Sequence, residues 1–216
     1  MIDFWSIPRC WPGECVAILA GGKSLTPEAV EHVRGRCRVI AINRAFELAP
    51  WADWLYGCDS DRFWRWYPEA RDFAGTKIVV RPVNCGPARW RELEELVTAG
   101  VKIIRHSARD LPCMVRHEGA SGDPAVVRGN NSLFQLLSVI EHTGAATVLL
   151  LGADMHKGHW HSGYGEIGEP DYAGSVIPRF ETLVKPLAAA GVTVLNCSPG
   201  SALPFWPHVV ELRDVI

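Results

Sequence analysis

The feature that most constrains the fold is a series of short apolar runs separated by segments with helical character. A run that is apolar at every position, rather than at alternate positions, is typical of a strand buried on both faces. Parallel strands need crossover connections of the kind that helical segments supply. The pattern therefore predicts an α/β fold, namely a Rossmann-like, doubly wound, mostly parallel sheet with helices on both faces. The predicted strands are residues 15–20, 38–43, 52–58, 77–81, 101–105, 147–152 and 192–196.

The length of 216 residues fits one domain, so we expect a single nucleotide-binding domain over residues 1–216. Residues 107–127 have mixed polarity and no clear period, which predicts a lid or substrate loop. Residues 154–174 are rich in glycine and histidine and are expected to form an active-site loop.

Helix signals lie between the apolar runs. Thr26 is a candidate N-cap, and Pro27 would occupy the first helical position. Further helices are expected at about 90–99, 132–141 and 176–190, with a short one after His208. The helix over 176–190 contains Pro186, which predicts a kink or a break.

Composition excludes several classes of protein. The net charge of -2 and the absence of a basic run argue against a protein that binds nucleic acid by bulk electrostatics. No apolar run approaches the roughly 20 residues of a membrane span. Seven scattered cysteines lack the paired spacing of a zinc site, and with no signal peptide they favour a cytoplasmic protein. The tryptophans near Trp64 suggest a homo-oligomer as a hypothesis to test.

The first predicted strand ends at a glycine turn, Gly21-Gly22-Lys23-Ser24. Glycines allow a ligand to approach the backbone, and the amides and Lys23 would favour an anion. The turn does not meet the P-loop pattern GxxxxGK[ST], and GxGxxG is absent. The sequence thus predicts a phosphate or nucleotide here without predicting ATP hydrolysis.

A second polar cluster lies later in the chain. Residues 128–132, which include Asn130, Asn131 and Ser132, form a polar turn that opens a helix, and Asp154 ends the apolar strand that follows it. In open α/β sheets, ligands bind at the carboxyl ends of the strands. Asn43, Asp59, Asn196 and Ser198 also follow predicted strands. We therefore expect a site at this edge, although a strand end is also polar simply because it reaches the surface.

Asp59-Ser60-Asp61 is a DxD triplet directly after a predicted strand. Two carboxylates two residues apart can hold Mg²⁺ or Mn²⁺ against a nucleotide diphosphate, so Asp59 and Asp61 are candidate metal ligands. The same triplet is also typical of a helix N-terminus, with Asp59 or Ser60 as the cap.

Three histidines, His156, His159 and His161, follow Asp154 in a loop that also holds Trp160. His-x-His can bind a metal, but no cysteine lies near and Asp154 is the only close carboxylate, which disfavours structural zinc. A general base is a better use of His159 or His161, since histidine titrates near neutral pH. The candidate catalytic residues are therefore His159, His161 and Asp154. A surface loop with incidental histidines is the alternative.

These residues carry a resemblance to known families. Residues 20–25, AGGKSL, resemble the GxGPSL opening of a group of bacterial sialyltransferases, and they are similar to that of the archaeal 6-hydroxymethylpterin diphosphokinases. Residues 41–45 resemble the group's second-strand motif, and residues 129–132 with 149–154 resemble its later block. The His-Trp-His loop and a Cys-Ser-Pro-x-Ser ending are similar to bacteriophage proteins of unassigned function.

The resemblance implies that a nucleotide lies at the carboxyl edge of the sheet. Gly21, Gly22 and Ser24 would line its phosphates, and Asn43 would contact the phosphate or the sugar. Asn131 and Ser132 would hold the ribose or the base. His159 or His161 would deprotonate the acceptor. Lys23 and Leu133 depart from the motifs, and the sialyltransferases need no metal, which disfavours the metal interpretation of the DxD triplet.

Three hypotheses follow. The first is a sialyltransferase-like glycosyltransferase, which moves a sugar from a nucleotide-activated donor to a hydroxyl of a small-molecule or glycan acceptor. The second is a Mg²⁺-dependent diphosphokinase or phosphotransferase of the pterin type, with Asp59, Asp61 or Asp154 on the metal. The third is a non-catalytic nucleotide-binding protein encoded by a phage.

Overall fold

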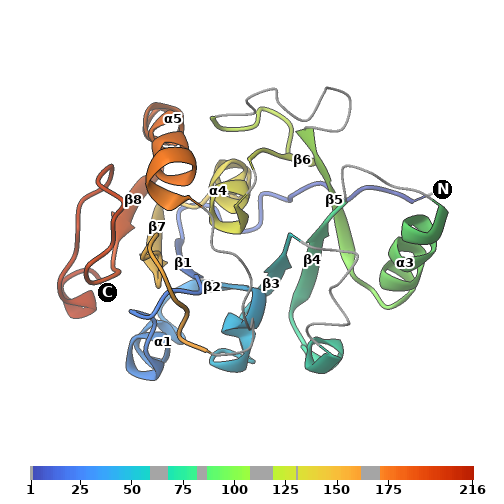
Figure 1. Ribbon diagram of the computed structural model, residues 1–216, viewed down its shortest axis with the longest axis horizontal. Helices are drawn as coiled ribbons and strands as arrows, with labels where there is room; N and C mark the ends of the chain where they lie inside the picture. Colours follow the sequence, from blue (N-terminus) through green and yellow to red (C-terminus); the bar gives the residue numbers. More distant parts are fainter. Residues whose placement is uncertain (1, 59–67, 82–86, 108–118, 130, 162–170) are drawn as a thin grey trace.

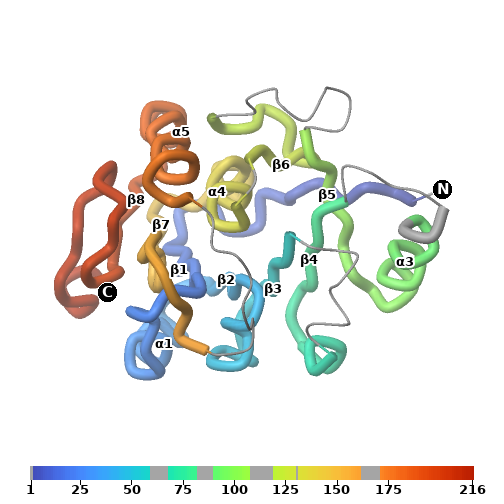
Figure 2. Tube along the Cα trace, in the orientation of Figure 1, coloured from blue at the N-terminus to red at the C-terminus, as the bar shows by residue number. Residues whose placement is uncertain are grey.

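The computed structural model describes residues 2–58, 68–81, 87–107, 119–129, 131–161 and 171–216 (Figures 1 and 2). Its strands form one sheet in which every pairing is parallel. The strands are β1 (Cys15–Leu19), β2 (Arg38–Ile42), β3 (Trp54–Gly57), β4 (Thr76–Val80), β5 (Lys102–His106), β6 (Val126–Val127), β7 (Thr147–Leu151) and β8 (Thr193–Asn196).

The strand order is β6-β5-β4-β3-β2-β1-β7-β8. The chain first moves outward from β1 to β6 and then returns to the other side of β1 with β7. Such a reversal is the topological switch point of a doubly wound sheet, where a crevice opens at the carboxyl ends of the strands. The predicted fold class is therefore confirmed, and the switch point lies between β1 and β7.

Both faces of the sheet are buried, as continuous apolar strands require. Val16 and Ile18 of β1 pack into one core cluster, and Ala17 and Leu19 pack into the other. The first cluster contains the apolar side chains of helices α4 (Ser132–Leu137) and α5 (Ile177–Ala189). The second contains those of α1 (Pro27–Val33) and α3 (Pro87–Thr98). Figure 1 shows α4 and α5 on one side of the sheet and α1 on the other.

Helix signals in the sequence gave mixed results. Thr26 caps α1 by accepting a hydrogen bond from the Ala29 amide at 3.2 Å, and Pro27 opens the helix, as predicted. The helix after residue 131 is shorter than expected, because a 3-10 turn, η5 (Ile140–Thr143), replaces its second half. The predicted break at Pro186 is wrong, since α5 continues through it to Ala189.

Within the described part of the chain, three further short helices connect the elements. They are the 3-10 turns η1 (Asn43–Glu47) and η3 (Pro68–Asp72), and the π-helical turn η6 (Tyr172–Val176), which leads directly into α5. The tail after His208 contains only a 3-10 turn, η7 (Leu212–Asp214). None of the helices in the described ranges has the length and apolarity to cross a membrane.

Two regions that looked irregular in the sequence have defined partners. The N-terminal arm packs Trp11 against Trp54 with ring centroids 4.1 Å apart, and both indoles are buried. Trp54 and Tyr56 are thus core residues, as predicted, whereas Trp64 and Trp66 lie outside the described residues. The predicted loop 107–127 contributes β6, which pairs with β5 at the sheet edge. Residues 108–118 of that loop are outside the described ranges.

Candidate functional site

A pocket of about 120 Å³ lies at the switch point, where the chain leaves β1, β2 and β7. Its walls are the segment after β1, the start of η1, the start of α4, the loop after β7 and one residue of η6. Eight of the residues predicted from the sequence line it: Gly21, Gly22, Asn43, Asn131, Ser132, Asp154, His159 and His161. The structure thus brings together predicted residues as distant in the sequence as Gly21 and His161, which are 140 positions apart.

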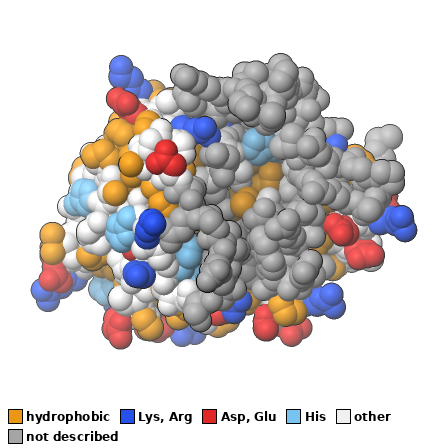
Figure 3. Space-filling model, in the orientation of Figure 1, with side chains coloured by type: hydrophobic (Ala, Val, Ile, Leu, Met, Phe, Trp, Pro, Cys, Tyr) orange, Lys and Arg blue, Asp and Glu red, His pale blue; other side chains and the backbone are white. Residues whose placement is uncertain are grey.

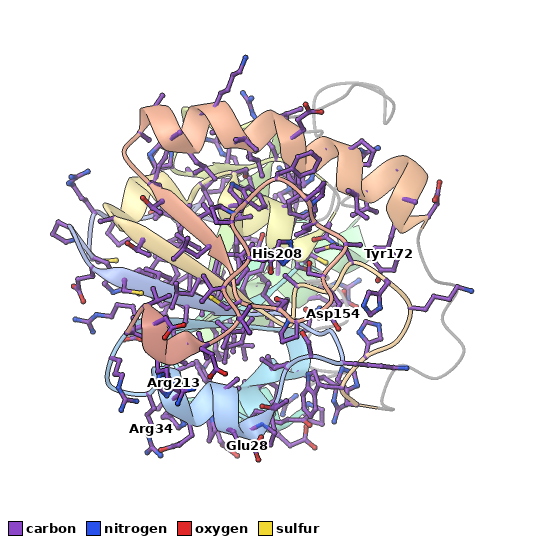
Figure 4. All side chains as sticks on the ribbon, turned by 90° about the vertical axis from the view of Figure 1, so that its left-hand side faces the viewer. Glu28, Arg34, Asp154, Tyr172, His208 and Arg213 are labelled. Carbon is purple, nitrogen blue, oxygen red and sulfur yellow. The ribbon has the colours of Figure 1, made fainter. Side chains whose placement is uncertain are left out.

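Asp154 forms the floor of the pocket and ties β7 to the turn after β1. One carboxylate oxygen accepts a hydrogen bond from the Ser24 amide at 2.9 Å, and the other accepts one from the Ser24 hydroxyl. The side chain is 3% exposed, and Figure 4 shows it within the fold while Glu28 and Arg34 lie at the surface. A buried carboxylate is stable only when hydrogen bonds compensate its lost hydration, which Ser24 does here.

Gly22 is required by this arrangement. A Cβ atom at position 22 would lie 2.4 Å from Cγ of Asp154, closer than any packed contact. The Gly22 amide donates to the Gly152 carbonyl at 2.8 Å. Hence the amides of Gly22 and Ser24 bind within the protein, and they position the turn. We call Gly22, Ser24 and Asp154 the β1–β7 corner.

The segment after β8 supports the corner from behind. The Ser198 hydroxyl accepts a hydrogen bond from the Ala153 amide at 2.8 Å, and the Ser201 hydroxyl donates to the Ala153 carbonyl at 2.6 Å. The Ala202 amide donates to the Asp154 carbonyl at 2.8 Å. Asn196 and Ser198 were among the polar strand-end groups expected at the edge that holds the site. The structure gives them a positioning role beneath the corner.

Backbone strain is concentrated at the pocket. Asn43 and Met155 are the non-glycine residues with positive φ in the described ranges, at 51° and 55°, and both line the pocket. Left-handed backbone costs a non-glycine residue about 1 kcal/mol or more, and such residues cluster at functional sites. Asn43 directly follows β2, and Met155 follows Asp154 after β7. The backbone therefore changes direction at a strained residue after two of the three strands that converge on the pocket.

The histidine loop, residues 156–161, folds back over the glycine turn. His159 Nδ1 lies 3.1 Å from the Gly21 carbonyl oxygen, and the Trp160 amide donates to the same oxygen at 3.2 Å. The rings of His159 and His161 stack with centroids 5.5 Å apart and planes 14° apart. His156 is exposed.

Burial lowers the pKa of His161 to about 4, with further contributions from His159 and Arg44. His161 is therefore neutral at pH 7. The Gly21 carbonyl can only accept a hydrogen bond, so Nδ1 of His159 carries the proton there. Nε2 is then the basic nitrogen of the neutral ring.

Basic side chains frame the pocket. Lys23 crosses the glycine of the histidine loop, since a Cβ at Gly158 would lie 2.2 Å from Lys23 Cε. Arg44 lines the pocket and pairs with Glu47 at 2.5 Å, while its buried Nε has no hydrogen-bond partner within the described ranges. Figure 3 shows histidine and basic side chains close together left of centre on the face that it views.

Asn131 and Ser132 line the pocket from the start of α4. The Asn131 side chain caps this helix by accepting from the Leu133 and Phe134 amides at 3.0 and 3.3 Å. Behind it, the Tyr56 hydroxyl donates to Gln135 Oε1, and Gln135 Nε2 donates to the Gly129 carbonyl, each at 2.9 Å. The buried Tyr56–Gln135 pair therefore fixes the turn that presents Asn131 and Ser132.

Some site residues were not predicted, and some predicted ones fall outside the structure's coverage. Arg44, Met155 and Tyr172 line the pocket without having been proposed. Arg44 directly follows Asn43, and this position next to a predicted strand end was the available signal. Asp59, Asp61 and Asn130 lie outside the described residues. Within the described ranges, no group of three or more histidine, cysteine, aspartate or glutamate side chains is arranged to hold a metal ion.

Comparison with known proteins shows a likeness in fold. No family model matches the sequence, and no curated protein matches it. The structure is similar to the crystal structure of the sialyltransferase CST-II in complex with a trisaccharide acceptor and CMP. The TM-score is 0.55 at 9% sequence identity, and the alignment covers 92% of this chain and 86% of that one. The chain therefore has a sialyltransferase-like fold.

Proposed function

We propose that the protein is a glycosyltransferase that transfers a sugar from a nucleotide-activated donor to a hydroxyl group of an acceptor. The observation that carries the proposal is the placement of His159 directly over the Gly21–Gly22 turn, at the switch point of a sialyltransferase-like sheet. This puts a proton acceptor beside the position where such sheets bind phosphate.

The donor phosphate would lie between the glycine turn and η1. Lys23 and Arg44 are the cations at this position, and Arg44 has a buried nitrogen that a phosphate oxygen would satisfy. As the bond from the anomeric carbon to the phosphate oxygen breaks, negative charge develops on the leaving nucleotide. Fixed cations next to that oxygen stabilise the transition state more than the ground state.

The acceptor hydroxyl would be activated by His159. Nε2 of its neutral ring takes the hydroxyl proton while the acceptor oxygen forms its bond to the anomeric carbon. His161, with a pKa lowered to about 4, is too weak a base to compete at neutral pH. Its role would be to hold the His159 ring in place by stacking, with the ring centroids 5.5 Å apart.

The alternative is the metal-dependent phosphotransferase, in which Asp154 would hold Mg²⁺ while its oxygens also accept hydrogen bonds from Ser24. Strict dependence of turnover on Mg²⁺ would favour that alternative. A non-catalytic nucleotide-binding protein predicts the same pocket without turnover. Kinetics separate it from the glycosyltransferase.

The test is donor turnover by the full chain, measured as release of free nucleotide from cytidine- and uridine-activated sugars with and without an acceptor glycan. We expect metal-independent release that falls 10²- to 10⁴-fold in His159→Gln, the usual contribution of a general base. The control is His32→Gln, at a histidine of α1 that does not line the pocket, which should retain activity. Turnover that His159→Gln leaves unchanged would refute the assignment.

A further inference from the structure

Two cysteine side chains contact each other at the end of the sheet where the strands begin, and the pocket lies at the other end, where they finish. Cys15 is the first residue of β1, and Cys37 directly precedes β2. Their sulfur atoms are 2.9 Å apart, with the Cys37 thiol donating a hydrogen bond to Cys15. Neither side chain serves the proposed transfer reaction, because the pocket lies at the carboxyl ends of these strands.

The strand register independently supports this proximity. Val16 pairs with Arg38 across the parallel β1–β2 ladder, so Cys15 and Cys37 are the preceding neighbours in the same register. Neighbouring strands lie about 4.8 Å apart, and disulfides bridge Cα atoms that are about 4.4–6.8 Å apart. The backbone therefore already has the separation that a disulfide needs.

Exposure distinguishes this pair from a third thiol nearby. Cys15 and Cys37 are partly exposed, whereas Cys197, on the same side of the sheet, is buried. The hydrogen bond from Cys37 lowers the pKa of Cys15, and burial raises the pKa of Cys197 to about 11. The reactive thiolate is thus the partly accessible one, and its partner thiol is already in contact.

We propose that Cys15 and Cys37 form an oxidation-sensitive dithiol that a hydroperoxide converts into an intramolecular disulfide. The Cys15 thiolate attacks a peroxide oxygen, the O–O bond breaks, and a sulfenic acid forms on Cys15. The Cys37 sulfur then displaces the sulfenic oxygen, which leaves as water with the Cys37 proton. Overall, two thiols lose two electrons and two protons, and hydrogen peroxide is reduced to two waters.

The disulfide would close a chain loop that contains the glycine turn and α1. Such a bond constrains the unfolded chain and does not require the folded strands to separate. A loop of this size predicts that the melting temperature rises by about 5–10 °C on oxidation. A thiol reductant reverses the change.

The experiment treats the intact protein with equimolar hydrogen peroxide, alkylates the remaining thiols and measures intact mass, a peptide map and the melting temperature. We expect the loss of two hydrogens, a Cys15–Cys37 cross-linked peptide and the higher melting temperature. Cys15→Ser and Cys37→Ser should each abolish all three changes. Cys10→Ser, which removes an exposed thiol in the N-terminal arm, should abolish none.

Before oxidation, the three variants should melt within a few degrees of the wild type, which separates a lost cross-link from misfolding. Sulfinic acid without a cross-link, a disulfide that involves Cys197, or a cross-link that survives in Cys37→Ser would overturn the proposal.

Discussion

The two sides of the pocket are built on different principles. The β1–β7 corner is held by a buried carboxylate, two hydrogen bonds from Ser24 and a glycine at which a Cβ atom would clash with that carboxylate. The histidine loop, by contrast, is partly exposed, and it contacts the glycine turn at the Gly21 carbonyl oxygen and where Lys23 packs against Gly158. Buried networks rigidify, whereas more exposed loops adapt. We infer that the corner fixes where the ligand lies and that the loop supplies the chemistry.

The largest expected effect separates chemistry from stability. His159→Gln should reduce turnover by the equivalent of about 3–5 kcal/mol in activation free energy, since it removes a general base. The melting temperature should change by less, because the His159 side chain is only partly buried. Parallel measurement of kcat and melting temperature checks this. A stability loss as large as the activity loss would break the distinction between loop and corner.

The second-largest effect is expected in the free energy of unfolding. Asp154→Asn places an amide NH₂ group against the Ser24 donors, which leaves a buried donor unpaired and should cost about 2–3 kcal/mol of unfolding free energy. Chemical denaturation measures it. Asp214→Asn, at an exposed aspartate in η7, is the matched control and should be silent. An equally stable Asp154→Asn protein would contradict the structural role of the carboxylate.

Gly22→Ala tests the packing of the same corner, because it adds one methyl group and no polar atom. The added Cβ would meet the Asp154 carboxylate at 2.4 Å, and overpacking of this kind costs about 1–3 kcal/mol. We expect a lower unfolding free energy and weaker nucleotide binding. Gly122→Ala, whose Cβ would meet nothing within 4 Å, is the matched control, because neither Gly22 nor Gly122 has a positive φ. It should leave stability and binding intact.

Acidification should lower the free energy of unfolding through His161 of the histidine loop. His161 has a folded-state pKa of about 4 against an ordinary value of 6.5, so between these values the unfolded chain binds the extra proton. Stability is therefore fully present above pH 6.5 and falls as the pH drops toward 4, by about 1 kcal/mol after allowance for solvent screening. His161→Gln should flatten this part of the profile. A wild-type unfolding free energy that increases as the pH falls from 6.5 to 4 would contradict this assignment.

The smallest predicted effect concerns Lys23. Its stem crosses Gly158, which lines the pocket, and the side chain is exposed. An exposed cation contributes about 1 kcal/mol or less to binding an anion. Lys23→Met should weaken nucleotide binding about fivefold and less so at high salt. Calorimetry at two ionic strengths checks it. A binding defect that is independent of salt would point to lost packing instead.

Local sequence signals were sufficient for seven of the described strands and for eight residues of the pocket. Continuous apolar runs predicted β1, β2 and β7, and polar residues at their ends marked Gly21, Asn43 and Asp154. β6 was missed because a two-residue strand has no period to detect. The α4 helix ended early because β-branched and polar residues follow Leu137.

The sequence does not show which polar residues contact one another and which of them face the pocket. The contact between Ser24 and Asp154 joins residues 130 positions apart, and Ser198 turned out to support Ala153 from behind. Asn131 illustrates the same limit, because its amide both caps a helix and lines the pocket. Polar strand ends look alike in sequence, and only the packed sheet separates ligand-facing groups from positioning groups.

The most direct test of the central claim is calorimetric titration of the protein with cytidine and uridine nucleotides, ATP and nucleotide sugars, each with and without Mg²⁺. The account predicts metal-independent binding of a pyrimidine nucleotide that Gly22→Ala weakens and His159→Gln preserves. Binding of ATP alone and only with Mg²⁺, or no binding by any of these ligands, would contradict it.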